Sequence, residues 1–268
     1  MTDTVTVLGI NGRIGQFAAK AFIESGWNVI GFGRSNRAQF DGFEFCQGDG
    51  FELDDVKRAI ADADVVIHAL NLPYDKWERE AERLNMVVIE AMKRTGKTLI
   101  FSGNVYNFSA DTVRMTPDAP QNPETAKGEI RKRMEDDLRD AAELHGFKAH
   151  ILRGGDFYGP GSEGSWFDLG IAMNFKKRQI TQPCDGATKH SWAYLPDFGR
   201  AFEKVAAKRD ELGAFENFHF HGHFVTGSEM SETELKRLMR DPRYWRDHDP
   251  ALTRKVQNGF KQLYPDGA

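Results

Sequence analysis

The chain has few cysteines, no long apolar run and no excess of basic charge. Cys46 and Cys184 are its only cysteines, and they lie far apart without CxxC spacing. This argues against a disulfide framework or a thiolate metal site and fits a reduced compartment. No apolar stretch reaches about 18 residues, and no basic segment precedes an apolar one at the N-terminus. We therefore expect a cytoplasmic protein without a membrane span.

The charge balance argues against a nucleic-acid partner. The formal net charge is −4 at pH 7 over 268 residues, and Lys and Arg are mixed with Asp and Glu. Such a chain has no broad basic field for phosphate backbones. Its length suits one large α/β domain or a main domain with a smaller companion. We expect a small-molecule substrate as the main partner.

Short β-branched runs alternate with longer amphipathic stretches along the first part of the chain. This alternation predicts βαβ units and a doubly wound parallel sheet of the Rossmann type, an α/β fold with helices on both faces. The expected strands cover 4–9, 27–33, 64–70, 97–103 and 148–155. The expected helices cover 12–25, 52–61, 75–95 and 122–145, the last with Pro123 near its start and Gly146 at its end.

After Gly155 the sequence becomes rich in glycine and aromatics, and "DFYGPGSEGSWFDLG" is typical of a loop. We predict a dinucleotide-binding domain over 1–155 that also receives strands from about 188–196 and 215–222. A small discontinuous C-terminal substrate region would then comprise 156–187 and 223–268. Its tail is expected to form short helices that break at Pro242 and Pro250.

Three glycines, Gly9, Gly12 and Gly15, stand between the first expected strand and helix. In that context glycines permit a tight turn and let backbone amides approach a pyrophosphate, while the positive end of the helix faces the anion. Glycines also end strands and permit helix packing, so the spacing is not decisive alone. The candidate cofactor-binding residues in this turn are Gly9, Asn11, Gly12, Arg13, Ile14 and Gly15.

The end of the second strand bears on the choice of cofactor. An acidic residue there would hold the ribose hydroxyls of NAD, whereas a basic residue suits the 2′-phosphate of NADP. The chain offers Gly33 and Arg34, and Arg13 could reach the same phosphate. NADP is therefore predicted over NAD, although both arginines could simply be solvated loop residues.

Several segments, taken in order, resemble the extended short-chain dehydrogenase/reductase family, the NAD(P)-dependent sugar epimerases and dehydratases. They are the glycine turn, "GDG" at 48–50, "DVVIHAL" at 64–70, "FSGNVYN" at 101–107, "LRGGDFYGPG" at 152–161 and "SWAYLPDFGRAF" at 191–202. Each is weak alone, and the resemblance rests on six segments in the right order. It covers roughly residues 5 to 225.

The resemblance implies further cofactor contacts and an assembly. Asp49 would accept a hydrogen bond from the adenine amino group beside Gly50, although an Asp in "QGDG" could equally form a turn. The end of the fourth strand would also meet the cofactor, at Ala69, Leu70 and Asn71. Many relatives dimerise through the two long helices, here 75–95 and 122–145, so a homodimer is expected.

The catalytic pair of that family, Tyr-x-x-x-Lys on one helix face, is missing. Counting back from Glu135 places Lys127 and Arg131 at the two positions. Both would lie on one helix face, where Arg131 could hold ribose or phosphate oxygens. Lys127 could carry a proton only if burial or a neighbouring charge lowered its pKa. A solvated basic face with an Arg131–Glu135 ion pair is the alternative.

Other residues could take part in chemistry or substrate binding. Ser102, Asn104 and Tyr106 follow or end the fifth strand, where Asn104 could donate a hydrogen bond to a carbonyl but cannot titrate. The substrate candidates are Tyr158, His190, Trp192 and Tyr194, of which the last three alternate along an expected strand and so share one face. Tyr106 and Tyr158 could instead be structural, and His190 a hydrogen-bonded structural histidine.

A cluster of histidines at "HFHGH" does not predict a metal site. On a strand His219, His221 and His223 would point the same way. No carboxylate or cysteine accompanies them at a ligand spacing, and Gly222 indicates a turn near the end of the strand.

Three functions remain open at this point. The first is an NADP-dependent oxidoreductase or epimerase-like enzyme acting on a small polar or sugar-like substrate, with Lys127 and Arg131 in place of the usual pair. The second is a non-catalytic NAD(P)-binding sensor or scaffold. The third is a nucleotide-sugar or nucleoside-phosphate binding domain without a nicotinamide role.

Overall fold

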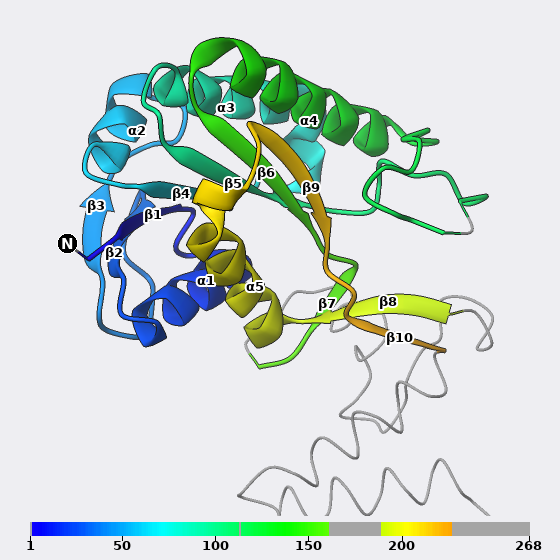
Figure 1. The fold of residues 1–268 in the computed structure, drawn as a ribbon, viewed down its shortest axis with the longest axis horizontal. Helices are drawn as coiled ribbons and strands as arrows, with labels where there is room; N and C mark the ends of the chain where they lie inside the picture. Colours follow the sequence, from blue (N-terminus) through cyan, green and yellow to red (C-terminus); the bar gives the residue numbers. More distant parts are fainter. Residues whose placement is uncertain (1, 113, 161–188, 227–268) are drawn as a thin grey trace, which may run out of the picture.

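The computed structural model describes residues 2–112, 114–160 and 189–226 (Figure 1). Its main feature is a seven-stranded sheet in which every neighbouring pair is parallel. The predicted doubly wound α/β fold is confirmed. In spatial order the strands are β3 (Glu44–Gln47), β2 (Asn28–Gly33), β1 (Thr4–Leu8), β4 (Val65–His68), β5 (Thr98–Gly103), β6 (Lys148–Arg153) and β9 (Phe215–His219).

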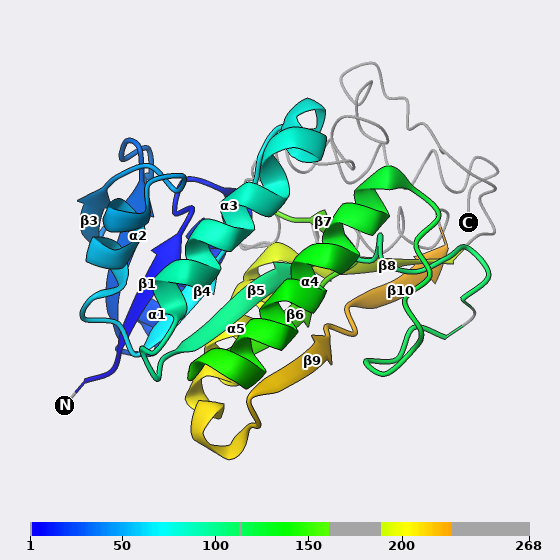
Figure 2. The same cartoon turned by 90° about the horizontal axis from the view of Figure 1, so that it is seen from above.

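Helices cover both faces of this sheet, because its central strands are apolar on both sides; all four residues of β4 are buried. One face carries α1 (Arg13–Glu24) and α5 (Leu195–Ala207). The other carries α2 (Leu53–Ile60), α3 (Trp77–Met92) and α4 (Ala126–His145), and α3 and α4 run side by side across it (Figure 2). Two short 3₁₀ helices, η1 (Tyr74–Lys76) and η4 (Arg209–Glu211), connect longer elements. Among the described helices, none has the length and apolarity that crossing a membrane requires.

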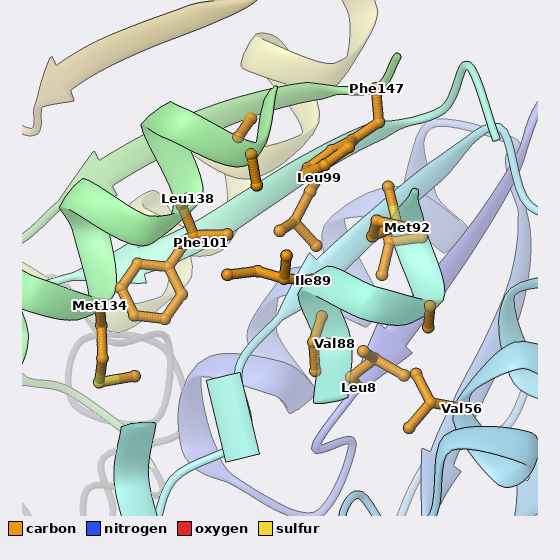
Figure 3. Packing of buried hydrophobic residues seen from close by; sticks show 14 of the residues in the cluster. Leu8, Val56, Val88, Ile89, Met92, Leu99, Phe101, Met134, Leu138 and Phe147 are labelled. Carbon is orange, nitrogen blue, oxygen red and sulfur yellow. The ribbon is translucent and has the colours of Figure 1, made fainter. Parts of the chain in front are cut away.

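The hydrophobic core has two layers, one on each side of the sheet. The layer beneath α2, α3 and α4 is shown in Figure 3, where Ile89 of α3 and Leu138 of α4 pack onto Leu99 and Phe101 of β5. The layer beneath α1 and α5 contains Phe22, Phe198 and Phe202 together with the opposite face of β1. Burying each such side chain stabilises the fold by about 1.5–3 kcal/mol, so the sheet is a rigid support for the loops at its edges.

The fourth helix begins later than the sequence suggests. Thr125 is its N-cap, and the Thr125 hydroxyl accepts a hydrogen bond from the Gly128 amide at 3.1 Å. The expected start at 122 is therefore four residues early, because the capping threonine, and not Pro123, sets the first turn. The predicted end is confirmed: Gly146 takes the left-handed conformation, with φ +67°.

A second, three-stranded sheet lies beyond the carboxyl ends of β6 and β9 (Figure 1). Its strands are β7 (Asp156–Tyr158), β8 (Lys189–Tyr194) and β10 (His223–Thr226), in the order β10-β8-β7. The segment 188–196 thus differs from its expected place in the large sheet, because both edges of β8 are paired within the small one. The strand expected at 215–222 does join the large sheet, as β9.

Three of the described strands were not predicted. β3 has four residues at the edge of the large sheet, β7 has three in a segment expected to be a loop, and β10 has four at the start of the predicted substrate region 223–268. All three are too short to give a clear two-residue alternation, so tertiary pairing decides their structure. Most of the predicted substrate region, including the tail helices around Pro242 and Pro250, lies outside the described residues.

Candidate dinucleotide and substrate site

The glycine turn and the residues after β4 meet at the carboxyl edge of the sheet. β1 and β4 are neighbours, and the chain runs from β1 towards β2 on one side and from β4 towards β5 on the other. This is the point at which the strand order reverses, where open α/β sheets bind their ligands. The Gly9 and Ile10 amides donate to the Phe32 carbonyl at 3.1 and 3.2 Å, which ties the turn to β2.

Close backbone approach requires glycine at two of the three positions and makes the third tight. Gly9 has φ +94°, and a Cβ there would lie 2.7 Å from the Ala69 carbonyl oxygen. A Cβ on Gly15 would overlap the Gly9 carbonyl oxygen, whereas one on Gly12 would lie 3.3 Å from it. Glycine at positions 9 and 15 therefore lets the turn fold this tightly and lets α1 start beside it.

The start of α1 presents backbone amides and no competing negative charge. Gly12 is its N-cap, so no side chain caps the helix, and its first turn contains no acidic residue. In an α-helix the amides of the first turn point away from the helix and are not used by its i to i−4 hydrogen bonds. Together with the helix dipole they form a cradle that fits a pyrophosphate. The predicted turn residues thus come together in a geometry suited to a dinucleotide.

Asn11 has a role that the sequence did not reveal. Its Nδ2 donates to the Ser35 carbonyl at 2.6 Å, and its Oδ1 accepts from the Arg37 amide at 2.8 Å. The side chain therefore clamps the loop after β2 onto the glycine turn. Because both ends of the amide are used, Asn11 fixes the position of this loop beside the glycine turn.

The loop after β2 places arginines where the second strand ends. A Cβ on Gly33 would lie 3.1 Å from the Asn11 Nδ2, so a side chain at the position of the usual acidic residue would be in tight contact with Asn11. Arg34 and Arg37 follow, and both are exposed. The Arg34 backbone is held in place, because its carbonyl accepts from the Gln47 side chain at 3.2 Å. This edge of the site therefore carries positive charge and no carboxylate at position 33.

Asp49 forms a turn at the end of β3. Its Oδ1 accepts from the Phe51 amide at 3.0 Å, and its own amide donates to Asp55 at 2.9 Å. Gly50 is buried, and a Cβ there would meet the Leu70 side chain at 2.9 Å. Asp49 thus forms the turn, and the hydrogen bond from Phe51 holds its carboxylate in place. The neighbouring Gly50 packs against Leu70, in the segment that follows β4. An adenine contact remains a prediction.

The segment after β4 lies against the cradle. The Ala69 amide donates to the Leu8 carbonyl at 3.0 Å, and the Ala69 carbonyl faces Gly9. His68 is buried beneath, with its ring 5.0 Å from that of Phe101. A cavity of about 10 Å³, room for at most one water, is lined here by residues that include His68, Leu70, Asn71 and Arg131.

Arg131 turns into the protein rather than out to solvent. Its guanidinium donates to the Ser102 carbonyl and lies 4.5 Å from the ring centre of Phe101 and 5.7 Å from that of Trp77. Burial lowers the pKa of Arg131 to about 10, so it stays a cation at neutral pH. Arg131 therefore brings a fixed positive charge to the end of β5, at a buried position.

Lys127, one turn earlier, belongs to an aromatic cluster at the mouth of the site. Its Nζ lies 4.3 Å from the ring centre of Tyr74. The Tyr74 hydroxyl is 3.0 Å from that of Tyr106, which follows β5. Burial, and then the hydrogen bond to Tyr74, raise the pKa of Tyr106. Lys127 and Tyr106 are thus brought together by Tyr74, a residue that the sequence gave no reason to select.

A buried ion-pair network holds the loop between β5 and α4. Glu135 receives two hydrogen bonds from Arg153 of β6, at 2.8 and 2.6 Å, so its ion-pair partner is Arg153 and not Arg131. Arg153 also donates to the Asn104 carbonyl at 2.6 Å. The Asn104 Oδ1 accepts from the Tyr106 amide at 3.1 Å. This contact uses the side-chain oxygen of Asn104 and not its amide donor.

The substrate candidates lie on the small sheet. The rings of Tyr158 and Tyr194 are 5.2 Å apart, and those of His190 and Trp192 are 5.9 Å apart. His190 Nδ1 lies 3.5 Å from Asp156 Oδ2, and burial raises the pKa of Asp156 while His190 opposes that shift. Asp156 is a candidate that sequence reasoning missed, because its partner stands 34 positions away on another strand.

The histidines around Gly222 are separated by a turn. His219 ends β9 and His223 starts β10, with Gly222 at φ +58° between them. His219 Nε2 accepts from Arg153 at 3.2 Å, and its Nδ1 faces the Met115 carbonyl at 3.0 Å. Within residues 2–112, 114–160 and 189–226, no group of three or more potential metal ligands is found.

The strand order changes direction between β1 and β4, and the glycine turn and the start of α1 lie at that point. This arrangement defines an α/β protein of the dinucleotide-binding class. The NAD dependent epimerase/dehydratase family matches residues 5–219, and the chain belongs to that family. The resemblance to extended short-chain dehydrogenases/reductases is thereby confirmed. No curated protein sequence matches the chain.

Solved structures with the same fold include sugar-nucleotide enzymes. The protein MoeE5, solved with UDP-glucose and NAD, is 19% identical with a TM-score of 0.74 over 87% of this chain and 81% of that one. UDP-glucose 4-epimerase from Brucella ovis, solved with NAD, is 17% identical with a TM-score of 0.74 over 88% and 82%. UDP-N-acetylglucosamine 4-epimerase from Bacillus cereus is 18% identical with a TM-score of 0.71 over 88% and 84%.

Proposed function

We propose that the protein is an NADP-dependent oxidoreductase or epimerase-like enzyme that acts on a small polar or sugar-like substrate. The observation that carries this proposal is the cradle formed by Gly9, Gly12 and Gly15, in which a Cβ at any of the three would meet backbone. The family supports a nicotinamide cofactor. The UDP-sugars named for two of the structural neighbours support a sugar-like substrate.

The preference for NADP rests on the end of β2. Asn11 fills the space beside Gly33, so no carboxylate stands there to hold ribose hydroxyls. Arg34 and Arg37 are exposed on the clamped loop, and Arg13 starts α1. A guanidinium suits a phosphate through paired hydrogen bonds. NAD, which is present in several structurally similar proteins, is the competing cofactor.

Each part of the site has a task in this proposal. The glycine turn would hold the pyrophosphate, Asp49 the adenine and the segment 69–71 the middle of the cofactor. When bound, the nicotinamide would accept a hydride from the substrate carbon or return one to it. Lys127 and Arg131 supply positive charge beside the reacting oxygen, Arg131 from a fixed buried position and Lys127 from the mouth of the site. The side chains of Tyr158, His190, Trp192 and Tyr194 would face the substrate.

Calorimetric titration with NADPH and NADH at fixed salt tests the cofactor assignment. We expect tighter binding of NADPH, and we expect Arg34→Ala to reduce its affinity towards that of NADH. Arg133→Ala is the matched control, because it removes an equal charge from the exposed face of α4. Equal affinities for the two cofactors would contradict the NADP preference, and no binding of either would contradict the proposed function.

A second measurement separates an enzyme from a binding protein. Purified protein that binds NADPH is incubated with a panel of sugars and small carbonyl compounds, with NADPH or NADP⁺; the absorbance of the reduced cofactor and the NMR spectrum of each sugar are followed. A change in cofactor absorbance or conversion of any sugar supports catalysis. Tight binding with neither change across the panel would favour the non-catalytic sensor or scaffold.

A further inference from the structure

The mouth of the site contains two phenols in contact, each from a different loop. Tyr74 belongs to η1, which follows β4, and Tyr106 lies in the segment after β5. Their hydroxyl oxygens are 3.0 Å apart, a hydrogen-bond distance, although 32 residues separate them in sequence. The loops that carry the pair follow β4 and β5, which end at the same edge of the sheet as β1 and the glycine turn.

Two cations flank this pair. Lys127 Nζ lies 4.3 Å from the centre of the Tyr74 ring, and the Arg131 guanidinium interacts electrostatically with both phenols. A cation close to a phenol favours its ionised form. Asp156 of β7 acts in the opposite sense on Tyr106. The charged groups that face the pair are thus Lys127, Arg131 and Asp156.

The two phenols are not equivalent. Tyr74 is 54% exposed and Tyr106 is 38% exposed. Burial, followed by the hydrogen bond to Tyr74, raises the pKa of Tyr106. Either hydroxyl can donate in the hydrogen bond between the two tyrosines, and the Lys127 ammonium lies over the face of the Tyr74 ring. Tyr74, the more exposed of the two, is therefore the phenol that a substrate can reach more readily.

We propose that Tyr74 is the group that exchanges a proton with the substrate hydroxyl, with Tyr106 and Lys127 as its positioning residues. This rests on the proposed function and adds the proton carrier to it. In the reducing direction the Tyr74 Oη–H bond breaks and an O–H bond forms on the substrate oxygen, while the electron pair of the broken bond stays on the Tyr74 Oη, which then takes a proton from solvent. The reverse step returns the proton.

The close packing of α4 holds the arrangement in place. A Cβ on Gly128 would overlap the Tyr106 carbonyl oxygen, so the first turn of α4 touches the backbone of the Tyr106 segment. Lys127 is the residue before Gly128, so this contact also fixes the backbone from which the Lys127 side chain extends. On the other side, the indole of Trp77 lies 5.2 Å from the Tyr74 ring and 6.4 Å from the Tyr106 ring. The phenols are therefore supported from two elements.

Labelling with an aryl sulfonyl fluoride tests this without substrate or cofactor. The phenolate oxygen attacks sulfur, an O–S bond forms, fluoride leaves and the phenol proton passes to solvent. Peptide mass spectrometry then reports the labelling rate of each tyrosine. We expect Tyr74 to react several-fold faster than Tyr158 and Tyr194, and Lys127→Met or Tyr106→Phe to slow Tyr74 while leaving the other two rates unchanged.

The variants separate this inference from the proposed function. Exposure alone would leave Tyr74 equally reactive in Lys127→Met, and that result would overturn the inference. Tyr74→Phe should still bind NADPH in calorimetry but should lose hydride exchange with any substrate that the native protein turns over. Full turnover by Tyr74→Phe would also overturn it. Failure of the native protein to bind NADPH would contradict the proposed function instead, whatever the labelling shows.

Discussion

At the scale of single residues, two buried histidines set how the protein responds to acid. His68 lies at the end of β4 beneath the site, and His150 lies in β6 facing the Phe218 ring. Burial and the nearby Arg131 cation lower the pKa of His68 from 6.5 to about 3. Burial and Lys148 lower the pKa of His150 to about 4. The folded protein therefore keeps both imidazoles neutral at mildly acidic pH.

This predicts a loss of stability on acidification. Below about pH 6.5 the unfolded chain takes up protons that the folded chain does not, so the free energy of unfolding falls by roughly 1.4 kcal/mol per pH unit for each histidine. The loss continues until the folded pKa values are reached. Urea unfolding at pH 7 and pH 5 measures it. His150→Gln should weaken the pH dependence, whereas the exposed control His221→Gln should leave it unchanged; equal slopes in all three proteins would contradict the assignment.

At the scale of elements, a contact of α4 is expected to reverse the usual effect of replacing a helical glycine by alanine. Replacing glycine by alanine inside a helix normally stabilises it by about 1 kcal/mol. Gly128 lies in the first turn of α4, where a Cβ would overlap the Tyr106 carbonyl oxygen, which is backbone and cannot rotate away. The helix and the Tyr106 segment would have to separate to admit it.

We therefore predict that Gly128→Ala lowers the free energy of unfolding instead of raising it, as measured by urea denaturation. Glu129→Ala, at the exposed neighbouring position, is the control and should change stability little. The same Gly128→Ala protein should show slower sulfonylation of Tyr74, because the Tyr106 hydroxyl would move. A stabilised variant would show that α4 does not rest on this segment.

The elements also show what a sequence can and cannot predict here. β1, the glycine turn and α1 were predicted because their signals are local: an apolar strand, three spaced glycines and a helical pattern. The strand character of β8 was likewise visible in the alternation of His190, Trp192 and Tyr194. Its partners were not, because β7 and β10 are short and distant in sequence.

The candidate site likewise has parts that the sequence predicts and parts that it does not. The glycine cradle could be predicted, since each close approach in it involves backbone that the fold itself determines. The clamp made by Asn11, the inward turn of Arg131 and the contact of Tyr74 with Tyr106 depend on side chains that meet across elements. No spacing within one segment encodes such contacts, and only the packed structure reveals them.

At the scale of the whole molecule, the outer face of α3 and α4 bears on assembly. The two helices pack side by side, and Arg133 bridges to Glu82 across their exposed surface at 2.6 Å. Met86 of α3 is 43% exposed, and Leu144 of α4 is 74% exposed. Each of these helices therefore exposes one large apolar side chain, which a contact surface could cover.

We keep the expectation that the protein forms a homodimer through this face. Sedimentation velocity should show a dimer, and Met86→Glu should shift it towards monomer, because a charge would be buried against its symmetry mate. Glu24→Ala, at an exposed position of α1 on the opposite face of the sheet, should leave the dimer intact. A native protein that sediments as a monomer at all concentrations would contradict the expectation.

The Asn11 clamp also has an evolutionary consequence. An acidic residue at position 33 would crowd the Asn11 Nδ2 and release the loop that carries Arg34 and Arg37. Conversely, shortening Asn11 would free that loop while leaving position 33 without a carboxylate. Positions 11 and 33 are therefore coupled through one contact, and we expect a carboxylate at position 33 to be tolerated best when Asn11 is shortened as well.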